Sequence, residues 1–182
     1  MTQQEFEAQQ RGVARAMAGA LGVTILVLGI AAVWTSRVEV APLLHRLRFA
    51  LRLDLLVVVW LAVAIANVAR LRFFSPHDIA GSSVGTASEP VRAAGAILQN
   101  TFEQVVLAVV THLIVAASFA RSDAIVVALA CLFAIGRLLF WAGYGRDAPD
   151  RAFGFALTFY PTALALLVSA GAALIDLAGA AM

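Results

Sequence analysis

Residues 124–144 read AIVVALACLFAIGRLLFWAGY and contain a single charged side chain, that of Arg137. A helix over this stretch would be about 30 Å long, because an α-helix rises ~1.5 Å per residue, and this length matches the hydrocarbon core of a bilayer. The apolar residues are continuous and do not alternate with polar ones, which favours a helix over a barrel strand. The stretch therefore predicts a transmembrane helix.

Four further apolar segments predict spans at residues 13–34, 55–69, 91–120 and 152–175. The first follows Glu5 and Glu7 and is too long for a signal peptide, so we expect it to be a membrane helix. The second is short, and we expect it to extend back toward Leu43. Pro161 lies inside the last and should bend that helix without ending it. The predicted fold class is an all-α, multi-pass membrane protein.

The composition of the 182-residue chain excludes several classes of protein. Of its residues 62% are hydrophobic and 13% are charged, whereas soluble domains have about 25% charged residues, so a water-soluble enzyme is excluded. The net charge of +2 and the lack of a basic run argue against a nucleic-acid partner. Cys131, the single cysteine, is expected to be a small buried apolar residue. The three histidines lie too far apart to predict a metal site.

The joints between the spans differ in polarity. Residues 35–53 place arginines and leucines on different helical faces, which is typical of an interfacial helix or of the wet beginning of the second span. Residues 73–89 form a long polar loop, in which Ser75 and Ser88 each stand shortly before a proline and look like helix caps. Residues 81–85 lack the lysine of a phosphate-binding loop and are expected to form a flexible connector.

The distribution of arginine predicts the orientation. With five spans, more arginines fall on the side of the N-terminus than on the other side. Arginine and lysine are enriched on the cytoplasmic side of membrane proteins. We therefore expect the N-terminus and the long loop in the cytoplasm and the C-terminus outside.

Polar side chains also occur inside three spans, where hydrocarbon makes them costly and marks them as functional candidates. In the fourth span Arg137 is followed by Tyr144 two helical turns later, and Arg151 opens the fifth span. These groups overlap in height near the predicted cytoplasmic side, so a common pocket there would suit a small anionic or zwitterionic ligand. The residues that helical spacing places on one face of the third span are Arg92, Gln99, Asn100 and Glu103.

A structural role is the alternative for these groups. Glu103 and Arg137 would then pair to hold two helices together, because an unpaired charge in a span is worse. Tyr144 would be an aromatic residue of the membrane interface. His112, in the apolar part of the third span, is expected to pack between helices or to bond to the backbone.

Two motifs resemble those of the MAPEG superfamily, the membrane-associated proteins in eicosanoid and glutathione metabolism. One runs from Arg137 to Arg151 and contains a Gly-Tyr pair between the two arginines. The other is Asn100-x-x-Glu103, in the predicted helix that follows the polar loop. Together they resemble the signatures of the third-to-fourth helix and of the second helix of that family.

The resemblance implies an architecture. It covers about residues 43–177, so residues 43–182 would form a MAPEG-like four-helix membrane domain. Residues 1–42 would be an N-terminal segment with one additional transmembrane helix, at about residues 13–34. Members of the family assemble as homotrimers, and a bacterial-type member would lie in the inner (cell) membrane.

The resemblance also implies an activity, namely glutathione-dependent transfer to a lipophilic electrophile or reduction of a hydroperoxide. Glutathione would lie between neighbouring subunits near the cytoplasmic face, and Arg151 matches the arginine that activates its thiol. The implied partners are membrane lipids, further copies of the chain and a hydrophobic small molecule, with no metal. The candidate binding residues are Arg70, Arg72, Arg92, Gln99, Asn100, Glu103, Arg137 and Tyr144.

The chain departs from the family pattern at three positions. Ala96 stands where many catalytic members have an arginine, Leu98 where the residue is often polar, and Phe140 where a tyrosine is common. Arg92, one turn before Ala96, could replace the missing charge. These departures favour the alternative function, a non-catalytic membrane scaffold or accessory protein, whereas Arg151 favours the enzyme.

Overall fold

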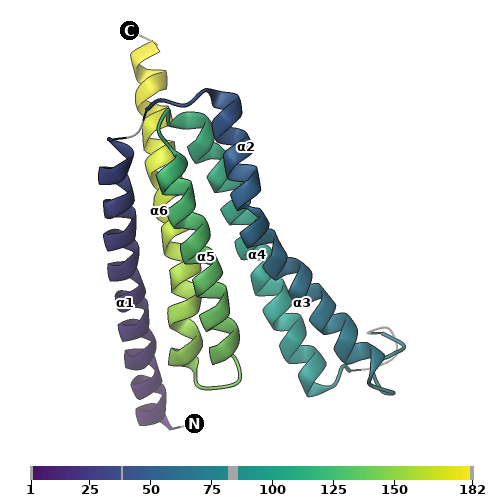
Figure 1. Cartoon of the computed structure of the whole chain (residues 1–182). Helices are drawn as coiled ribbons and strands as arrows, with labels where there is room; N and C mark the ends of the chain where they lie inside the picture. The colour runs from purple at the N-terminus through teal and green to yellow at the C-terminus, as the bar shows by residue number, and fades with distance from the viewer. Residues whose placement is uncertain (1, 38, 82–85, 181–182) are drawn as a thin grey trace.

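The computed structural model describes residues 2–37, 39–81 and 86–180, and all the regular structure in these ranges is helical (Figure 1). Helices of this length are expected for apolar segments in lipid, where every backbone polar group must be bonded within the segment. The helices are α1 (Gln3–Thr35), α2 (Leu43–Leu53), α3 (Leu55–Phe73), α4 (Glu89–Ser118), α5 (Asp123–Gly143) and α6 (Ala148–Ala180).

Five stretches of helix are long and apolar enough to cross a membrane, which confirms the predicted multi-pass fold. One of them, Leu43–Phe73, combines α2 and α3, so the second span does extend back to Leu43. Asp54 between these helices keeps helical dihedral angles, and its N–H donates to the carbonyl of Ala50 at 2.8 Å. Of the two interpretations of residues 35–53, the structure therefore has the beginning of the second span. The last span passes through Pro161 without ending.

The helices form two groups that diverge toward one end of the bundle (Figure 1). α1, α5 and α6 pack side by side in one group, and α3 packs along α4 in the other, with α2 resting on α4 and α5. We call the end where the chain begins, and where α5 is joined to α6, the N-terminal end. The end where α4 is joined to α5 is the C-terminal end.

Glycines allow α5 and α6 to approach each other closely. A Cβ added to Gly154 would lie 2.3 Å from the backbone nitrogen of Phe140, and one added to Gly136 would lie 2.6 Å from Cγ2 of Thr158. Helices in membranes associate through such close packing, because lipid supplies no hydrophobic force between them. Gly12 approaches Pro149 in the same way, so α1 begins beside the start of α6.

Cys131 lies exposed on α5, so the expectation of a buried cysteine is wrong. The adjacent residues Ala130 and Leu132 are 0% and 4% exposed. In a span that is apolar on every side, hydropathy does not reveal which face turns inward. The rotation of α5 is therefore set by packing, and it turns Cys131 away from the other helices.

A buried pair of polar side chains joins the second span to α4. Nδ1 of His112 lies 2.6 Å from Oδ1 of Asp54, and the side chains are 0% and 4% exposed. His112 packs between helices as expected, but its partner is a carboxylate and not the backbone. Nε2 of His112 and the second oxygen of Asp54 have no partner among the described residues. The two side chains therefore form a buried hydrogen-bonded pair, in which each one is the hydrogen-bond partner of the other.

We expect His112→Leu to destabilise the protein by about 3–5 kcal/mol, because it leaves the Asp54 carboxylate buried without a partner. The double variant Asp54→Leu/His112→Leu should recover most of this loss, since it removes both polar groups. Thermal unfolding in detergent measures the difference. His45→Leu is the control: this histidine is 60% exposed beside Asp123, and its loss should cost less than about 1 kcal/mol. A single variant as stable as the double would contradict the prediction.

Gly154→Ala should destabilise the bundle by about 1–3 kcal/mol, because its Cβ would force α5 and α6 apart. Gly171→Ala on the same helix is the matched control. A Cβ there meets no atom within 4 Å, so the variant should be neutral or up to about 1 kcal/mol more stable, since alanine is the better helix former. Melting temperatures of the two variants in the same detergent test this, and equal values would show that the close approach is unimportant.

Candidate functional site

Arg137 is the most deeply buried charged residue of the predicted site, at 0% exposed. Its Nη1 donates to Oδ1 of Asn100 on α4, and its Nη2 donates to Oγ1 of Thr158 on α6, both at 2.8 Å. The hydroxyl of Thr158 donates its hydrogen to the carbonyl of Phe155, so its oxygen can accept the hydrogen bond from the arginine. One guanidinium therefore ties three helices together inside the bundle.

Arg137 has the structural role that was given as the alternative, but its partner is not Glu103. The arginine does hold helices together, yet it bonds to Asn100 and Thr158, whereas Glu103 accepts a hydrogen bond from Nε2 of Gln99 at 2.9 Å. The reason is helical rotation. Gln99 and Glu103 are four residues apart and share an exposed face of α4, while Asn100 is turned about 100° from Gln99 and faces inward.

Two adjacent aromatic rings lie between two guanidinium groups, from the buried Arg137 on α5 to Arg151 at the start of α6. The Arg137 guanidinium carbon lies 4.5 Å from the ring centre of Phe140, and that ring lies 5.5 Å from Tyr144, edge to face. The guanidinium carbon of Arg151 lies 5.5 Å from the ring centre of Tyr144. Arginine over an aromatic face is a favourable arrangement. We call these four residues the arginine–aromatic row.

Local packing at the joint between α5 and α6 positions the exposed end of this row. Tyr144 is the C-cap of α5 and is half-buried, while Arg151 lies in the first turn of α6 and is exposed. Gly143 permits the tight return, because a Cβ there would lie 2.6 Å from the carbonyl oxygen of Asp150. The chain thus presents one accessible guanidinium beside a phenol at the N-terminal end.

The remaining predicted site residues lie on the other helix group. Arg92 forms an ion pair with Glu89 at the start of α4, and Arg70 donates to Oδ1 of Asn67 on α3 at 3.1 Å. Arg72 is half-buried in the last turn of α3. Within the described ranges no hydrogen bond or ion pair links these arginines to the arginine–aromatic row. A pocket that joins both sets stays a prediction.

A carboxylate organises the polar loop before α4. Asp78 accepts hydrogen bonds from the hydroxyls of Ser75 and Ser88 at 2.6 and 2.7 Å, and from the Ser88 N–H at 2.9 Å. Ser88 occupies the N-cap position of α4 as predicted, but its hydroxyl donates to Asp78 and makes no cap hydrogen bond. Ser75 begins a turn and not a helix, because its hydroxyl and carbonyl both bond to Asp78. In the predicted connector 81–85, residues 82–85 lie outside the described residues, and Gly81 has a φ of 80° that favours glycine.

The hydrogen bonds from Ser75, together with those from Ser88, lower the pKa of Asp78 from 3.8 to about 2. A carboxylate that accepts several hydrogen bonds is favoured over its protonated form. Asp78 was not among the residues that we singled out from the sequence. Its neighbours in a Ser-rich loop were the available signal, but only the fold brings residue 88 back to residue 78.

Comparison with known proteins identifies one family. The model of the MAPEG family matches residues 47–171, which is more than half of the chain. No curated protein matches the chain, and no solved structure matches it.

The lowered pKa of Asp78 predicts the acid sensitivity of the loop. Its contribution to stability should be complete above pH ~4 and lost as the pH falls toward ~2, since the folded pKa lies below the unfolded one. Amide hydrogen exchange at Ser88 measures this contribution. The Ser88 amide should exchange faster in Asp78→Asn than in the parent chain at pH 7, and the two exchange rates should become equal near pH 2. Asp176→Asn, a change on the exposed end of α6, is the control. Equal protection of Ser88 at pH 7 would contradict the prediction.

Proposed function

The chain belongs to the MAPEG family, and from this membership we propose that it is a glutathione-dependent transferase or peroxidase of the membrane. The matched residues 47–171 include α3, α4 and α5 and most of α2 and α6, whereas α1 precedes them. We propose the corresponding division into an N-terminal segment, residues 1–42, and a catalytic four-helix domain, residues 43–182. The substrate would be a lipophilic electrophile or hydroperoxide that arrives from the bilayer.

The observation that carries the proposal is the exposed guanidinium of Arg151 beside the ring of Tyr144, 5.5 Å away, at the end of the arginine–aromatic row. A free thiol has a pKa of about 8.5, so little of it is thiolate at neutral pH. A guanidinium next to the sulfur stabilises the thiolate and lowers that pKa. Each unit of lowering corresponds to about 1.4 kcal/mol.

The chemistry then requires a polar cosubstrate and an apolar substrate at one membrane boundary. In transfer, the thiolate sulfur forms a bond to an electrophilic carbon, a leaving group departs with its electron pair, and the thiol proton passes to water. In peroxide reduction, two glutathione molecules become the disulfide while the hydroperoxide becomes an alcohol and water. Arg151 has the same role in both reactions, since it holds the sulfur as the anion.

The exposed face of α4 supports a site shared between copies of the chain. The hydrogen-bonded Gln99 and Glu103 lie exposed beside Phe102, which is 50% exposed. A carboxylate that faces hydrocarbon is costly, so a second copy of the chain, or a ligand held there, would relieve this cost. We propose a homotrimer in which Glu103 binds the ammonium group of glutathione. The carboxylates of glutathione would be bound by the guanidinium groups of Arg70, Arg72 and Arg92.

Orientation follows the distribution of arginine. We propose that the N-terminal end of the bundle, with Arg151 and the polar loop, faces the cytoplasm, and that α6 ends outside. Glutathione would then enter from the cytoplasm, while the apolar substrate enters from the membrane. Insertion in a bacterial inner membrane is part of the same proposal.

A scaffold or accessory subunit is the second candidate function, and one observation favours it. Asn100 and Arg137 already satisfy each other inside the bundle, together with Thr158. These side chains therefore have less capacity left for a ligand than the family motif implies. Ala96 and Leu98, which supply no polar group, point in the same direction.

Conjugation of glutathione to a chloronitrobenzene electrophile, and reduction of a lipid hydroperoxide, test the proposal on the detergent-solubilised chain. We expect Arg151→Ala to lower the rate at least tenfold at neutral pH, because less of the sulfur is thiolate. Arg146→Ala, which removes an exposed arginine from the same joint, is the control and should retain the parent rate. The loss should shrink as the pH rises above ~8.5, where the thiol ionises by itself.

The two candidate functions give opposite results in this experiment. Absence of both activities, together with no increase in melting temperature at saturating glutathione, would favour the scaffold. Ligand at a hundred times its Kd should raise stability by about 2.7 kcal/mol, a shift that is readily measured. Equal activity of the parent chain and Arg151→Ala would be consistent with an enzyme but would overturn the proposed role of Arg151.

A further inference from the structure

We propose that α1 and the C-terminal end of the bundle together bind a single-chain anionic lipid, a fatty-acid carboxylate. The acyl chain would lie in an apolar pocket between α1, α4, α5 and α6, with the carboxylate beside Arg121. This site lies at the opposite end of the bundle from Arg151 and does not depend on the proposed enzymatic function.

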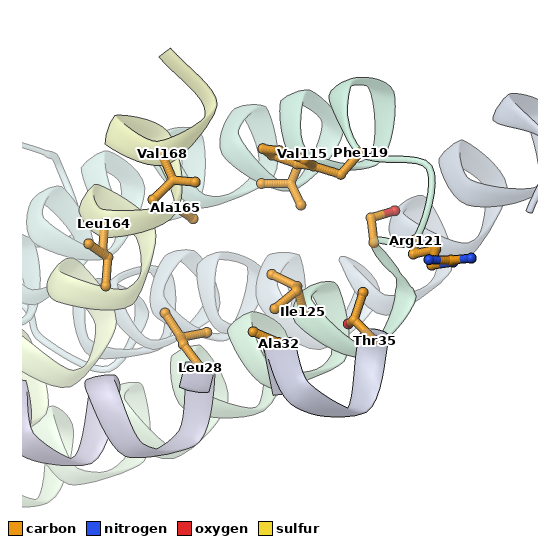
Figure 2. A pocket seen from close by; sticks show the side chains of 11 residues that line it. Leu28, Ala32, Thr35, Val115, Phe119, Arg121, Ile125, Leu164, Ala165 and Val168 are labelled. Atoms are coloured by element: carbon orange, nitrogen blue, oxygen red, sulfur yellow. The ribbon is translucent and has the colours of Figure 1, made fainter. Parts of the chain in front are cut away.

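The pocket is apolar along its length and has a volume of about 290 Å³. Its walls come from four helices, as Figure 2 shows: α1 contributes one side and faces residues of α5 and α6 across the cavity. This volume is at the lower limit of small-molecule sites, ~300–1,000 Å³, so it accepts one acyl chain and not two. The wall residues that matter here are Leu28, Ala32, Val115, Ile125, Leu164 and Val168.

The polar end of the pocket has hydrogen-bond donors without partners. Ser122 is 1% exposed, and its hydroxyl is buried and has no partner among the described residues. As the N-cap of α5 it would ordinarily cap the helix, but it makes no such bond. The hydroxyl of Thr35, at the end of α1, is likewise buried and unpartnered within the same ranges. Both residues line the pocket, so its polar end contains two hydroxyl donors without partners.

Arg121 supplies the positive charge at this end. Its side chain is exposed, lies at the edge of the pocket and extends away from the apolar wall residues in Figure 2, and makes no ion pair within 4 Å in the described ranges. Guanidinium and hydroxyl groups are donors from which a carboxylate accepts hydrogen bonds. Glu39 and Asp123 line a small hollow on another side of Arg121. Their charges disfavour a ligand that carries more than one negative charge.

The remaining geometry indicates that the ligand comes from the bilayer. Leu164 and Val168 line the pocket and are 37% and 55% exposed on the membrane-spanning part of α6, so the pocket opens sideways toward lipid. From Thr35 to Leu28 is two helical turns, about 10 Å, against ~15 Å for one leaflet of hydrocarbon. An acyl chain would therefore fill the pocket and extend beyond it into the membrane.

A photoreactive fatty acid with a diazirine in mid-chain tests the proposal on the full chain in phosphatidylcholine nanodiscs. We expect adducts on the wall residues of α1 and α6, which palmitate displaces and the matched fatty alcohol does not. Arg121→Gln should raise the fatty-acid concentration that gives half-maximal labelling about tenfold, which is the effect of losing one charged hydrogen-bonding group. Arg48→Gln removes an exposed arginine near the same end and should leave half-saturation unchanged. Ala32→Phe should remove the adducts by filling the pocket.

Four results would overturn the proposal. Adducts spread evenly over the lipid-facing surface would mean that the pocket binds nothing specifically. Equal displacement of the probe by the fatty alcohol and by palmitate would exclude recognition of the anion, and so would equal affinity of Arg121→Gln and the parent chain. Displacement by phosphatidylglycerol at lower concentration than palmitate would assign the site to a two-chain phospholipid.

Discussion

The bundle depends on its exclusion of water, which makes a buried polar group costly unless another group in the bundle bonds to it. Arg137 shows the consequence most directly: it is 0% exposed, and its two terminal nitrogens donate to Asn100 on α4 and Thr158 on α6. The Asp54–His112 pair does the same for the second span. These few directional bonds fix the rotation of helices that are otherwise apolar on most sides, and the glycine contacts between α5 and α6 then fix how closely they approach.

Much of the fold could be predicted from the sequence because lipid reduces the problem to finding long apolar runs. All five spans lie where hydropathy places them, and even the short run at residues 55–69 was expected to begin earlier. The errors are local. Ser75 begins a turn because its hydroxyl is used by Asp78, and Cys131 is exposed because α5 rotates according to its packing and not its hydropathy.

The candidate site could be predicted only in part, because spacing identifies which residues share a helix face but not which neighbour that face meets. The motif residues Arg137, Tyr144 and Arg151 do lie along one row. Asn100 and Glu103, however, point in different directions, although they are only three positions apart in the sequence. The partner of His112 lies 58 residues earlier in the chain, a distance over which no local pattern carries information.

The added first helix changes more than the number of crossings. A four-span unit returns the chain to the side on which it started, whereas five crossings place the two ends on opposite sides (Figure 1). Since Gly12 fits closely against Pro149, the hydrophilic first turns of α1 lie at the same end of the bundle as the start of α6, which carries Arg151. The extra span thus places the polar first turns of α1 next to the start of α6, although more than a hundred residues separate them in the sequence.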